Sequence, residues 1–167
     1  RLGTDYVDLY QIHSPDLTTP IEETVEAYND IVRSGKARYI GVSNFSGAQL
    51  VEALWAQDKN GFTKFKSIQP RYNLLYREAE RELFPACIDQ GVGAIVYSPQ
   101  AGGFLLGKHR DFKVETSAGG RFSDDFKGVN FYKNTYWNEP ACNAMEQFLT
   151  IAEKYNVSHM ALAIKGG

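Results

Sequence analysis

Apolar residues follow two different periods along the first part of the chain. Four short runs have the length and the β-branched and aromatic content of strands, at residues 6–12, 39–42, 65–69 and 94–97. Between them, apolar side chains recur every three or four positions, which predicts amphipathic helices over residues 20–34, 46–60 and 78–90. The runs are apolar on both faces, as parallel strands buried between two layers are. Strands that alternate with helices predict an α/β fold with a parallel sheet or barrel.

The ends of these helices carry start and stop signals. Thr19 is expected to cap the first helix, with Pro20 at its first position. Ser46 and Gln49 have the spacing of a capping box at the start of the second helix. Gly91 is expected to end the third helix.

The last part of the chain is less regular. Residues 109–138 read as a long connection rich in Gly, Asp, Lys, Asn and aromatic residues. Connections of this length are usually lids over a ligand or disordered segments. A helix is predicted over residues 140–155, and its apolar stripe suits core packing. Ser158 is the expected N-cap of a last helix.

A polar side chain stands where each predicted strand ends. These residues are His13, Ser43 with Asn44, Gln69, and Tyr97 with Ser98. Ligands bind at the carboxyl ends of parallel strands in barrels and doubly wound sheets, so polar ends in register predict one shared site. Two plainer interpretations stay open. Ser43 and Asn44 also suit a turn in which they bond their own backbone, and His13 also suits a structural role.

A glycine-rich segment follows the last predicted strand. Gly102 and Gly103 allow a ligand to approach the backbone closely, and Lys108 is a candidate to face a phosphate. The competing interpretation is a flexible loop with an exposed lysine. Further on, Arg121 and Phe122 are candidates to close over a bound ligand, although surface exposure is the more common fate of such residues.

Composition narrows the function classes. The chain has 167 residues, 43% of them hydrophobic, and a net charge of −2, so it suits one domain with a core and carries no nucleic-acid footprint. The two cysteines, Cys87 and Cys142, lie far apart and show no metal spacing or disulfide framework. No apolar run reaches the length of a membrane span and no signal peptide is visible. These features favour a cytoplasmic protein without a membrane partner.

At this point the residues resemble the aldo-keto reductase family. The matching segments are Leu-Gly-Thr-Asp-Tyr-Val-Asp-Leu-Tyr-Gln-Ile-His at 2–13, Gly-Lys-Ala-Arg-Tyr-Ile-Gly-Val-Ser-Asn-Phe at 35–45, Gln-Pro-Arg-Tyr-Asn-Leu at 69–74, Tyr-Ser-Pro at 97–99, Ala-Gly-Gly at 101–103 and Gly-Lys at 107–108. They cover most of the chain to residue 108 and are highly specific. The helices from residue 140 onward agree more loosely. The channel-subunit-like and the bacterial or fungal branches look most similar.

The resemblance implies a fold and a set of roles. The family is a (β/α)₈ TIM barrel that reduces aldehydes and ketones with NADPH, and the strands here would be the fourth to seventh of eight. His13 matches the histidine that orients the carbonyl. Three residues match those that hold the nicotinamide carboxamide, namely Ser43, Asn44 and Gln69. The aromatic ring stacked on the nicotinamide matches Tyr97. The pyrophosphate loop matches Ser98, Gly102, Gly103 and Lys108, and the lid residue matches Arg121.

The chain also departs from the family pattern. The catalytic Asp, Tyr and Lys of the family come from the first three strands, and the residues that bind the 2′-phosphate follow the eighth. Gln100 stands where Leu is common. Residues 1–167 are therefore interpreted as a single incomplete barrel domain, an internal fragment that looks cut at both ends. Its parent is expected to reduce small carbonyl compounds with NADPH, NADH not being excluded, and the fragment alone is expected to be inactive. The physiological substrate and the oligomeric state are left open.

Three rival interpretations remain. One is a nucleotide-binding, non-catalytic redox sensor that resembles the channel-associated members of the family. Another is a different barrel enzyme, such as a sugar isomerase, which would need metal-ligating carboxylates and histidines at the strand ends. The third is a half-barrel that associates through exposed edge strands.

Overall fold

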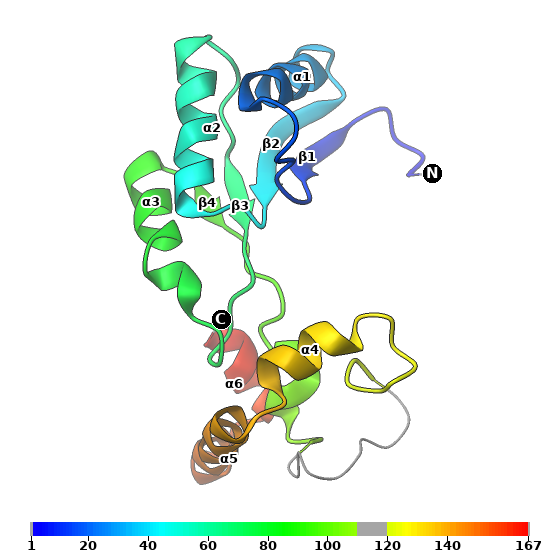
Figure 1. Ribbon diagram of the computed structural model, residues 1–167, viewed down its shortest axis with the longest axis vertical. Helices are drawn as coiled ribbons and strands as arrows, with labels where there is room; N and C mark the ends of the chain where they lie inside the picture. The colour runs from blue at the N-terminus through cyan, green and yellow to red at the C-terminus, as the bar shows by residue number, and fades with distance from the viewer. Residues whose placement is uncertain (1, 110–119, 167) are drawn as a thin grey trace. The chain divides into compact units, whose positions relative to one another are not determined.

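The computed structural model describes residues 2–109 and 120–166, which form two compact units (Figure 1). The first unit runs to Arg71 and continues from Glu78 to Tyr97, and the second contains Tyr72–Arg77 and the chain from Ser98 onward. The elements of the first unit are β1 (Val7–Ile12), α1 (Ile21–Arg33), β2 (Ala37–Ser43), α2 (Gly47–Lys59), β3 (Ser67–Gln69), the 3-10 turn η1 (Glu78–Glu80), α3 (Leu83–Gln90) and β4 (Gly93–Ala94).

The four strands form one parallel sheet in the order β1-β2-β3-β4. Each strand therefore lies beside the next strand of the chain, with a helical connection between them, which confirms the predicted α/β class. Ile12 lies opposite Val42 and Ser43 lies opposite Gln69. The carboxyl ends of β1, β2 and β3 are thus aligned at one edge of the sheet.

One face of the sheet is covered by helices. Ile40, Val42 and Ile68 are fully buried on this face. Helix α1 packs on β2 and beside α2, and α2 packs beside α3 (Figure 1). Burying these branched side chains stabilises the unit by roughly 1.5–3 kcal/mol for each.

The opposite face carries a polar bridge where two apolar faces were expected. The Ser67 hydroxyl donates a hydrogen bond to Gln11 Oε1 at 3.1 Å and so joins β3 to β1. Gly41 of β2 lies between the two residues in the register. A Cβ atom at Gly41 would lie 2.4 Å from Ser67 Oγ and 3.2 Å from Gln11 Oε1. The glycine is therefore required because this bridge passes over it.

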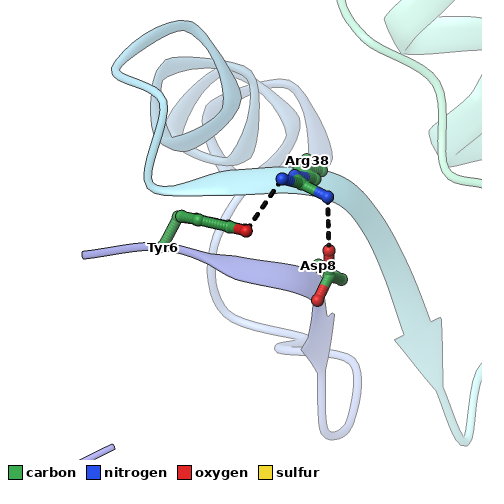
Figure 2. A network of polar contacts seen from close by, with 3 residues as sticks. All are labelled: Tyr6, Asp8 and Arg38. Carbon is green, nitrogen blue, oxygen red and sulfur yellow. Dashed lines mark hydrogen bonds and ion pairs between the residues drawn. The ribbon is translucent and has the colours of Figure 1, made fainter. Parts of the chain in front are cut away.

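A second polar contact joins β1 and β2 nearer their amino ends (Figure 2). Arg38 donates to Asp8 Oδ1 at 3.0 Å and to the Tyr6 hydroxyl at 2.8 Å. Its guanidinium carbon lies 4.3 Å from the centre of the Tyr6 ring. Both charged side chains are largely exposed, so the ion pair contributes at most about 1 kcal/mol. It tethers the start of β1 without holding the carboxyl-terminal edge of the sheet.

The expected cap of α1 is wrong. The helix starts at Ile21 with Pro20 in the N-cap position, and the proline side chain has no hydrogen-bonding group. Thr19 instead donates its hydroxyl to Asp16 Oδ2 at 2.7 Å. Thr18 donates both its backbone N–H and its hydroxyl to Asp16 Oδ1, at 2.8 and 2.7 Å. Because the helix begins one residue later than predicted, Thr19 does not occupy the N-cap position, and its hydroxyl bonds Asp16 in the preceding loop.

Helix α2 starts as predicted. Ser46 accepts from the Gln49 N–H while Gln49 accepts from the Ser46 N–H, so the capping box is complete. Glu82 adds a further contact, because its Oε1 accepts from the backbone N–H of Ala48 at 3.1 Å. Both contacts satisfy backbone N–H groups in the first turn that have no partner inside the helix.

The predicted helix over 78–90 is divided in two. A single 3-10 turn at Glu78–Glu80 precedes α3, which begins at Leu83. Pro85 explains the break, because a proline has no N–H and its ring clashes with the carbonyl four residues earlier. Gly91 ends α3, as predicted, and it has a left-handed backbone with φ of 66°.

Strand β4 is shorter than the predicted run over 94–97. It spans Gly93–Ala94. Beyond it, Ile95 N donates to Ile68 O at 2.9 Å and Tyr97 N donates to Pro70 O at 3.0 Å, and Tyr97 forms an isolated parallel bridge with Arg71. Pro70 has no N–H to donate, so the regular ladder is interrupted at this residue.

The second unit is helical. Its elements are the 3-10 segment η2 (Ala101–Leu106), α4 (Val129–Tyr136), α5 (Glu139–Lys154) and α6 (His159–Lys165). Helices α5 and α6 match the prediction, and Ser158 caps α6 by accepting from Ala161 N at 3.1 Å. Helix α4 falls in the predicted long connection, of which residues 110–119 lie outside the described part of the chain. In the described ranges, no helix has the length and apolar character needed to cross a membrane.

Aromatic side chains hold helix α4 against the core of the second unit. Tyr132 and Tyr136 are buried, and their rings pack with those of Phe104 and Phe122. Phe122 is fully buried, so the expectation that it closes over a ligand is wrong. A fully buried phenylalanine contributes to the core and cannot cover a bound molecule.

We predict that Gly41→Ala destabilises the protein by about 1–3 kcal/mol, because the new Cβ overlaps the Ser67 hydroxyl and the Ser67 carbonyl. Gly93→Ala is the matched control, since the nearest described atom to its Cβ is the Lys66 carbonyl oxygen at 3.6 Å. The control should change the free energy of unfolding by less than about 0.5 kcal/mol. Urea unfolding of both variants checks this, and equal effects would contradict the proposed requirement for glycine at position 41.

Asp16 gives a prediction for the loop after β1. Hydrogen bonds from the Thr18 side chain first, and then from the Thr18 backbone and the Thr19 side chain, lower its pKa from 3.8 to about 2. A lowered pKa means that the loop is stabilised above pH 3.8 and loses this stabilisation as the pH falls towards 2. The Asp16 carboxyl signal in an NMR titration should therefore move near pH 2, and Thr18→Ala should return it towards 3.8. An unchanged titration in that variant would contradict the assigned cause.

Candidate functional site

Three of the predicted site positions lie together at the carboxyl-terminal edge of the sheet. His13 follows Ile12, the last residue of β1, while Ser43 ends β2 and Gln69 ends β3. Because Ile12 pairs with Val42 and Ser43 with Gln69, these strand ends are neighbours. The predicted alignment is confirmed for the ends of β1, β2 and β3, whereas β4 ends at Ala94, three residues before Tyr97. The roles of the side chains stay predictions.

Ser43 is a buried hydroxyl with a fixed hydrogen bond. It is 3% exposed, and its Oγ donates to the Gln69 carbonyl oxygen at 2.8 Å. A carbonyl oxygen only accepts, so the hydroxyl hydrogen is used in this bond and the lone pairs of Ser43 Oγ face other groups as acceptors. Since the bond runs to the next strand, the interpretation of Ser43 as a turn residue bonded to its own backbone is wrong.

Asn44 connects the ends of β1 and β2 with the segment after β4. Its Nδ2 donates to the His13 carbonyl oxygen at 2.8 Å, and its Oδ1 accepts from the Tyr97 hydroxyl at 2.9 Å. Its backbone has φ of 59°, a left-handed conformation that asparagine adopts more readily than most residues. This amide bonds distant segments, which is also unlike an ordinary turn residue. One N–H and one lone pair of the amide stay available for a further partner.

The other members of this edge are more open. The His13 side chain is exposed, and Gln69 and Tyr97 are half-buried. The backbone N–H of Asn44 donates to the Gln69 carbonyl at 3.3 Å, which holds the two strand ends side by side. The imidazole of His13 is thus accessible to a molecule that approaches this edge.

A cleft of about 320 Å³ opens close to this edge. Its walls come from the loop after β1, from the start of α1 and from α2. The lining residues are Pro15, Asp16, Leu17, Thr19, Pro20, Ile21, Glu22, Phe45, Gln49 and Glu52. Pro15 and Phe45 lie only two residues and one residue beyond His13 and Asn44 in the sequence, so the strand ends and the cleft are shaped by the same loops.

The second unit contains the predicted glycine loop. Ser98 has φ of 59°, and its carbonyl oxygen accepts from Ala101 N at 2.9 Å and from Asn73 Nδ2 at 3.0 Å. Asn73 is fully buried and also donates to the Tyr136 hydroxyl at 2.9 Å. Asn73 thus fixes the turn at Ser98, a role that the sequence analysis did not assign to it. Asn73 belongs to the 69–74 segment that resembles the family, and this was the sequence feature from which a role for it could have been predicted.

The two glycines of this loop differ in their surroundings. Gly102 has φ of 70°, and a Cβ there would lie 2.4 Å from Cε1 of the Tyr132 ring. Gly103 has φ of 98°, and among the described residues nothing lies within 4 Å of its Cβ position. Close approach at Gly102 is therefore made by a side chain of this chain, while the space at Gly103 remains open to a ligand. Lys108 is exposed at the end of the loop.

Arg121 packs on the same tyrosine. Its Nη1 donates to the Tyr132 hydroxyl, and its guanidinium carbon lies 5.3 Å from the ring centre. Tyr132 thus contacts both Gly102 and Arg121, two residues that the sequence assigned to the cofactor. Tyr132 was not predicted as a site residue, because it lies in α4, where the sequence pattern predicts no helix.

His109 packs against two aromatic rings of the second unit. Its ring lies 4.8 Å from that of Phe122 and 5.5 Å from that of Trp137, measured between ring centres. Burial, together with the charge of Lys108, lowers the pKa of His109 below its usual value. The neutral imidazole is the form that suits these aromatic surroundings.

Comparison with known proteins gives this arrangement a family. The model of the Aldo/keto reductase family matches residues 1–165. The chain is 37% identical over 163 residues to an aldo-keto reductase of Fusarium vanettenii, and 40% identical over 163 residues to a putative aryl-alcohol dehydrogenase of Schizosaccharomyces pombe. Each match covers 98% of this chain, and 43% and 47% of the respective relative. It is also 49% identical over 105 residues to a versiconal hemiacetal acetate reductase of Aspergillus parasiticus, covering 63% of this chain and 30% of that protein.

The matched region covers almost all of this chain in two of these comparisons, but less than half the length of each relative. The chain spans about half the length, or less, of these curated relatives. Its four parallel strands with intervening helices are consistent with part of the family's TIM barrel. Since the family model covers almost the whole sequence, the chain belongs to the aldo/keto reductase family.

Proposed function

We propose that the full-length protein that contains this chain reduces aldehydes and ketones to alcohols by hydride transfer from NADPH. Family membership supports an oxidoreductase that acts on carbonyl compounds. The single observation that carries the proposal to this chain is the hydrogen-bonded edge that joins His13, Asn44 and Tyr97. Residues 1–167 are proposed to belong to a single barrel domain.

The free hydrogen-bonding groups of this edge fit a primary carboxamide. Ser43 Oγ has lone pairs left to accept, because its hydrogen is donated to Gln69. Asn44 has one N–H and one lone pair left, and the Gln69 side chain offers the same two kinds of group. A carboxamide needs one donor for its oxygen and acceptors for its NH₂ group. These residues are therefore proposed to bind the carboxamide of a nicotinamide ring.

The remaining residues of the edge suit the ring and the substrate. The half-buried Tyr97 side chain provides an aromatic surface on which a flat ring can stack. A bound reduced nicotinamide would supply the hydride. The exposed His13 imidazole is proposed to orient the substrate carbonyl and to assist its protonation, because imidazole exchanges protons near neutral pH.

The second unit supplies the proposed phosphate contacts. The open space at Gly103 and the exposed ammonium of Lys108 suit a pyrophosphate group, and Arg121 is proposed to pack on the cofactor as a lid residue. Ser98 and Gly102 determine the backbone conformation of this loop, since both have positive φ angles. NADPH is proposed as the preferred cofactor, and NADH is the comparison that tests the preference.

The names of the relatives suggest a substrate class for the first assay. One relative is named as a putative aryl-alcohol dehydrogenase and another as a reductase of a hemiacetal acetate. We therefore propose aromatic aldehydes as substrates. The partly apolar cleft, whose walls include Leu17 and Phe45, is of a character that suits an aromatic ring.

We predict that the full-length protein consumes NADPH in the presence of an aromatic aldehyde, and that His13→Gln lowers kcat/KM by about 100-fold or more. The dissociation constant for NADPH should stay unchanged, because His13 is proposed to contact the substrate and not the cofactor. Loss of NADPH absorbance gives the rate, and fluorescence titration gives the binding.

The control for this experiment is His159→Gln in α6, a histidine outside the proposed site. It should leave the rate unchanged. Absence of any NADPH-dependent reduction by the full-length protein would contradict the proposed function. Equal rates of wild type and His13→Gln would contradict only the role of His13.

A further inference from the structure

The hydrogen bonds at Asn44 have a fixed direction. The His13 carbonyl oxygen, 2.8 Å from Asn44 Nδ2, only accepts, so the NH₂ group of the amide must face it. Asn44 Oδ1 then faces Tyr97, and the Tyr97 hydroxyl must donate its hydrogen across the 2.9 Å contact. A rotated amide would place two acceptor oxygens against each other at His13. The contacts therefore allow one amide orientation.

This direction determines what Asn44 offers to a ligand. With one N–H given to His13 and one lone pair taken by Tyr97, the amide keeps a single donor and a single acceptor. Both bonds restrain the plane of the amide, one at each end. Without the Tyr97 hydroxyl, no hydrogen bond from the described residues holds the oxygen end, and the acceptor loses its fixed direction.

The remaining pair of groups distinguishes between ligands. A primary carboxamide satisfies both the donor and the acceptor of Asn44. An acetyl group in its place has an oxygen but no N–H, so the Asn44 acceptor would face a group that cannot donate. An acceptor left unsatisfied in this way costs binding free energy.

We propose that the Tyr97 hydroxyl is a specificity-determining group, which fixes the Asn44 amide and thereby selects a carboxamide over a group that only accepts. Tyr97 acts on selectivity through Asn44, so its hydroxyl is a positioning group, separate from the stacking surface of its ring. The inference rests on the proposed function, because it assumes that this edge binds a nicotinamide.

The test compares two cofactors in the full-length protein, NADPH and its 3-acetylpyridine analogue. Wild type should bind NADPH more tightly than the analogue. Tyr97→Phe keeps the ring and removes only the hydroxyl, so it should lower the ratio of the two affinities by about two- to tenfold, the equivalent of one hydrogen bond. If the hydroxyl had a purely structural role, Tyr97→Phe would lower the affinities for both cofactors by the same factor and leave their ratio unchanged. The kcat at saturating NADPH should change less than this ratio.

Two further variants calibrate the result. Tyr28→Phe removes a hydroxyl from a tyrosine of α1 whose ring stacks on Tyr10, and it should leave the ratio unchanged. Asn44→Ala removes the amide itself and should lower the preference at least as much as Tyr97→Phe does. If neither cofactor binds to wild type, the proposed function fails and the inference with it. If Asn44→Ala lowers the preference while Tyr97→Phe retains it, only the inference is overturned.

An NMR measurement on the cofactor-free protein tests the restraint of the Asn44 amide independently of the proposed function. The NMR signals of the Asn44 side-chain NH₂ group should shift or broaden in Tyr97→Phe, because the amide loses the restraint at its oxygen. Asn60 is the internal control, since its Nδ2 donates to the Ala56 carbonyl at 2.8 Å in α2. Unchanged Asn44 signals would overturn the proposed restraint.

Discussion

The hydrogen bond from Ser67 to Gln11 is the interaction on which the carboxyl-terminal edge of the sheet depends. It crosses β2 above Gly41 and so fixes β1, β2 and β3 in one register. Two residues further along β2, the same register places Ser43 beside Gln69, and the hydroxyl of Ser43 bonds the next strand. Because Gly41 has no side chain, the bond from Ser67 to Gln11 can form. The strand register that this bond stabilises places Ser43 beside Gln69 at the site.

The two units stabilise their loops by different physical means. At the strand ends of the first unit, directed hydrogen bonds hold Asn44 between His13 and Tyr97. In the second unit, the buried Tyr132 contacts Gly102 and bonds Arg121. Directed bonds fix donors and acceptors for recognition of a polar group. Packing on a ring fixes the path of a backbone, and no atom of the described residues lies within 4 Å of the Cβ position at Gly103.

The sequence allowed the alternating strands and helices, the capping box at Ser46 and the polar strand ends to be predicted, because each depends on residues close together in the chain. The failures involve the start of α1 or distant contacts. Thr19 does not cap α1, because the helix begins one residue later than predicted and Pro20 stands in the N-cap position. Helix α4 and the burial of Phe122 depend on aromatic packing, which short-range periodicity does not contain. The bridge above Gly41 requires the register of three strands, which the sequence did not specify.

The central claim is that the edge formed by His13, Ser43, Asn44 and Tyr97 recognises the carboxamide of a nicotinamide cofactor. A crystal structure of the full-length protein with NADP⁺ tests it most directly. The account predicts that the carboxamide lies within about 3 Å of Ser43 Oγ and of the Asn44 side-chain amide, with the bond from Tyr97 to Asn44 retained. A nicotinamide bound away from these atoms, or an Asn44 amide turned to face Tyr97 with its nitrogen, would contradict it.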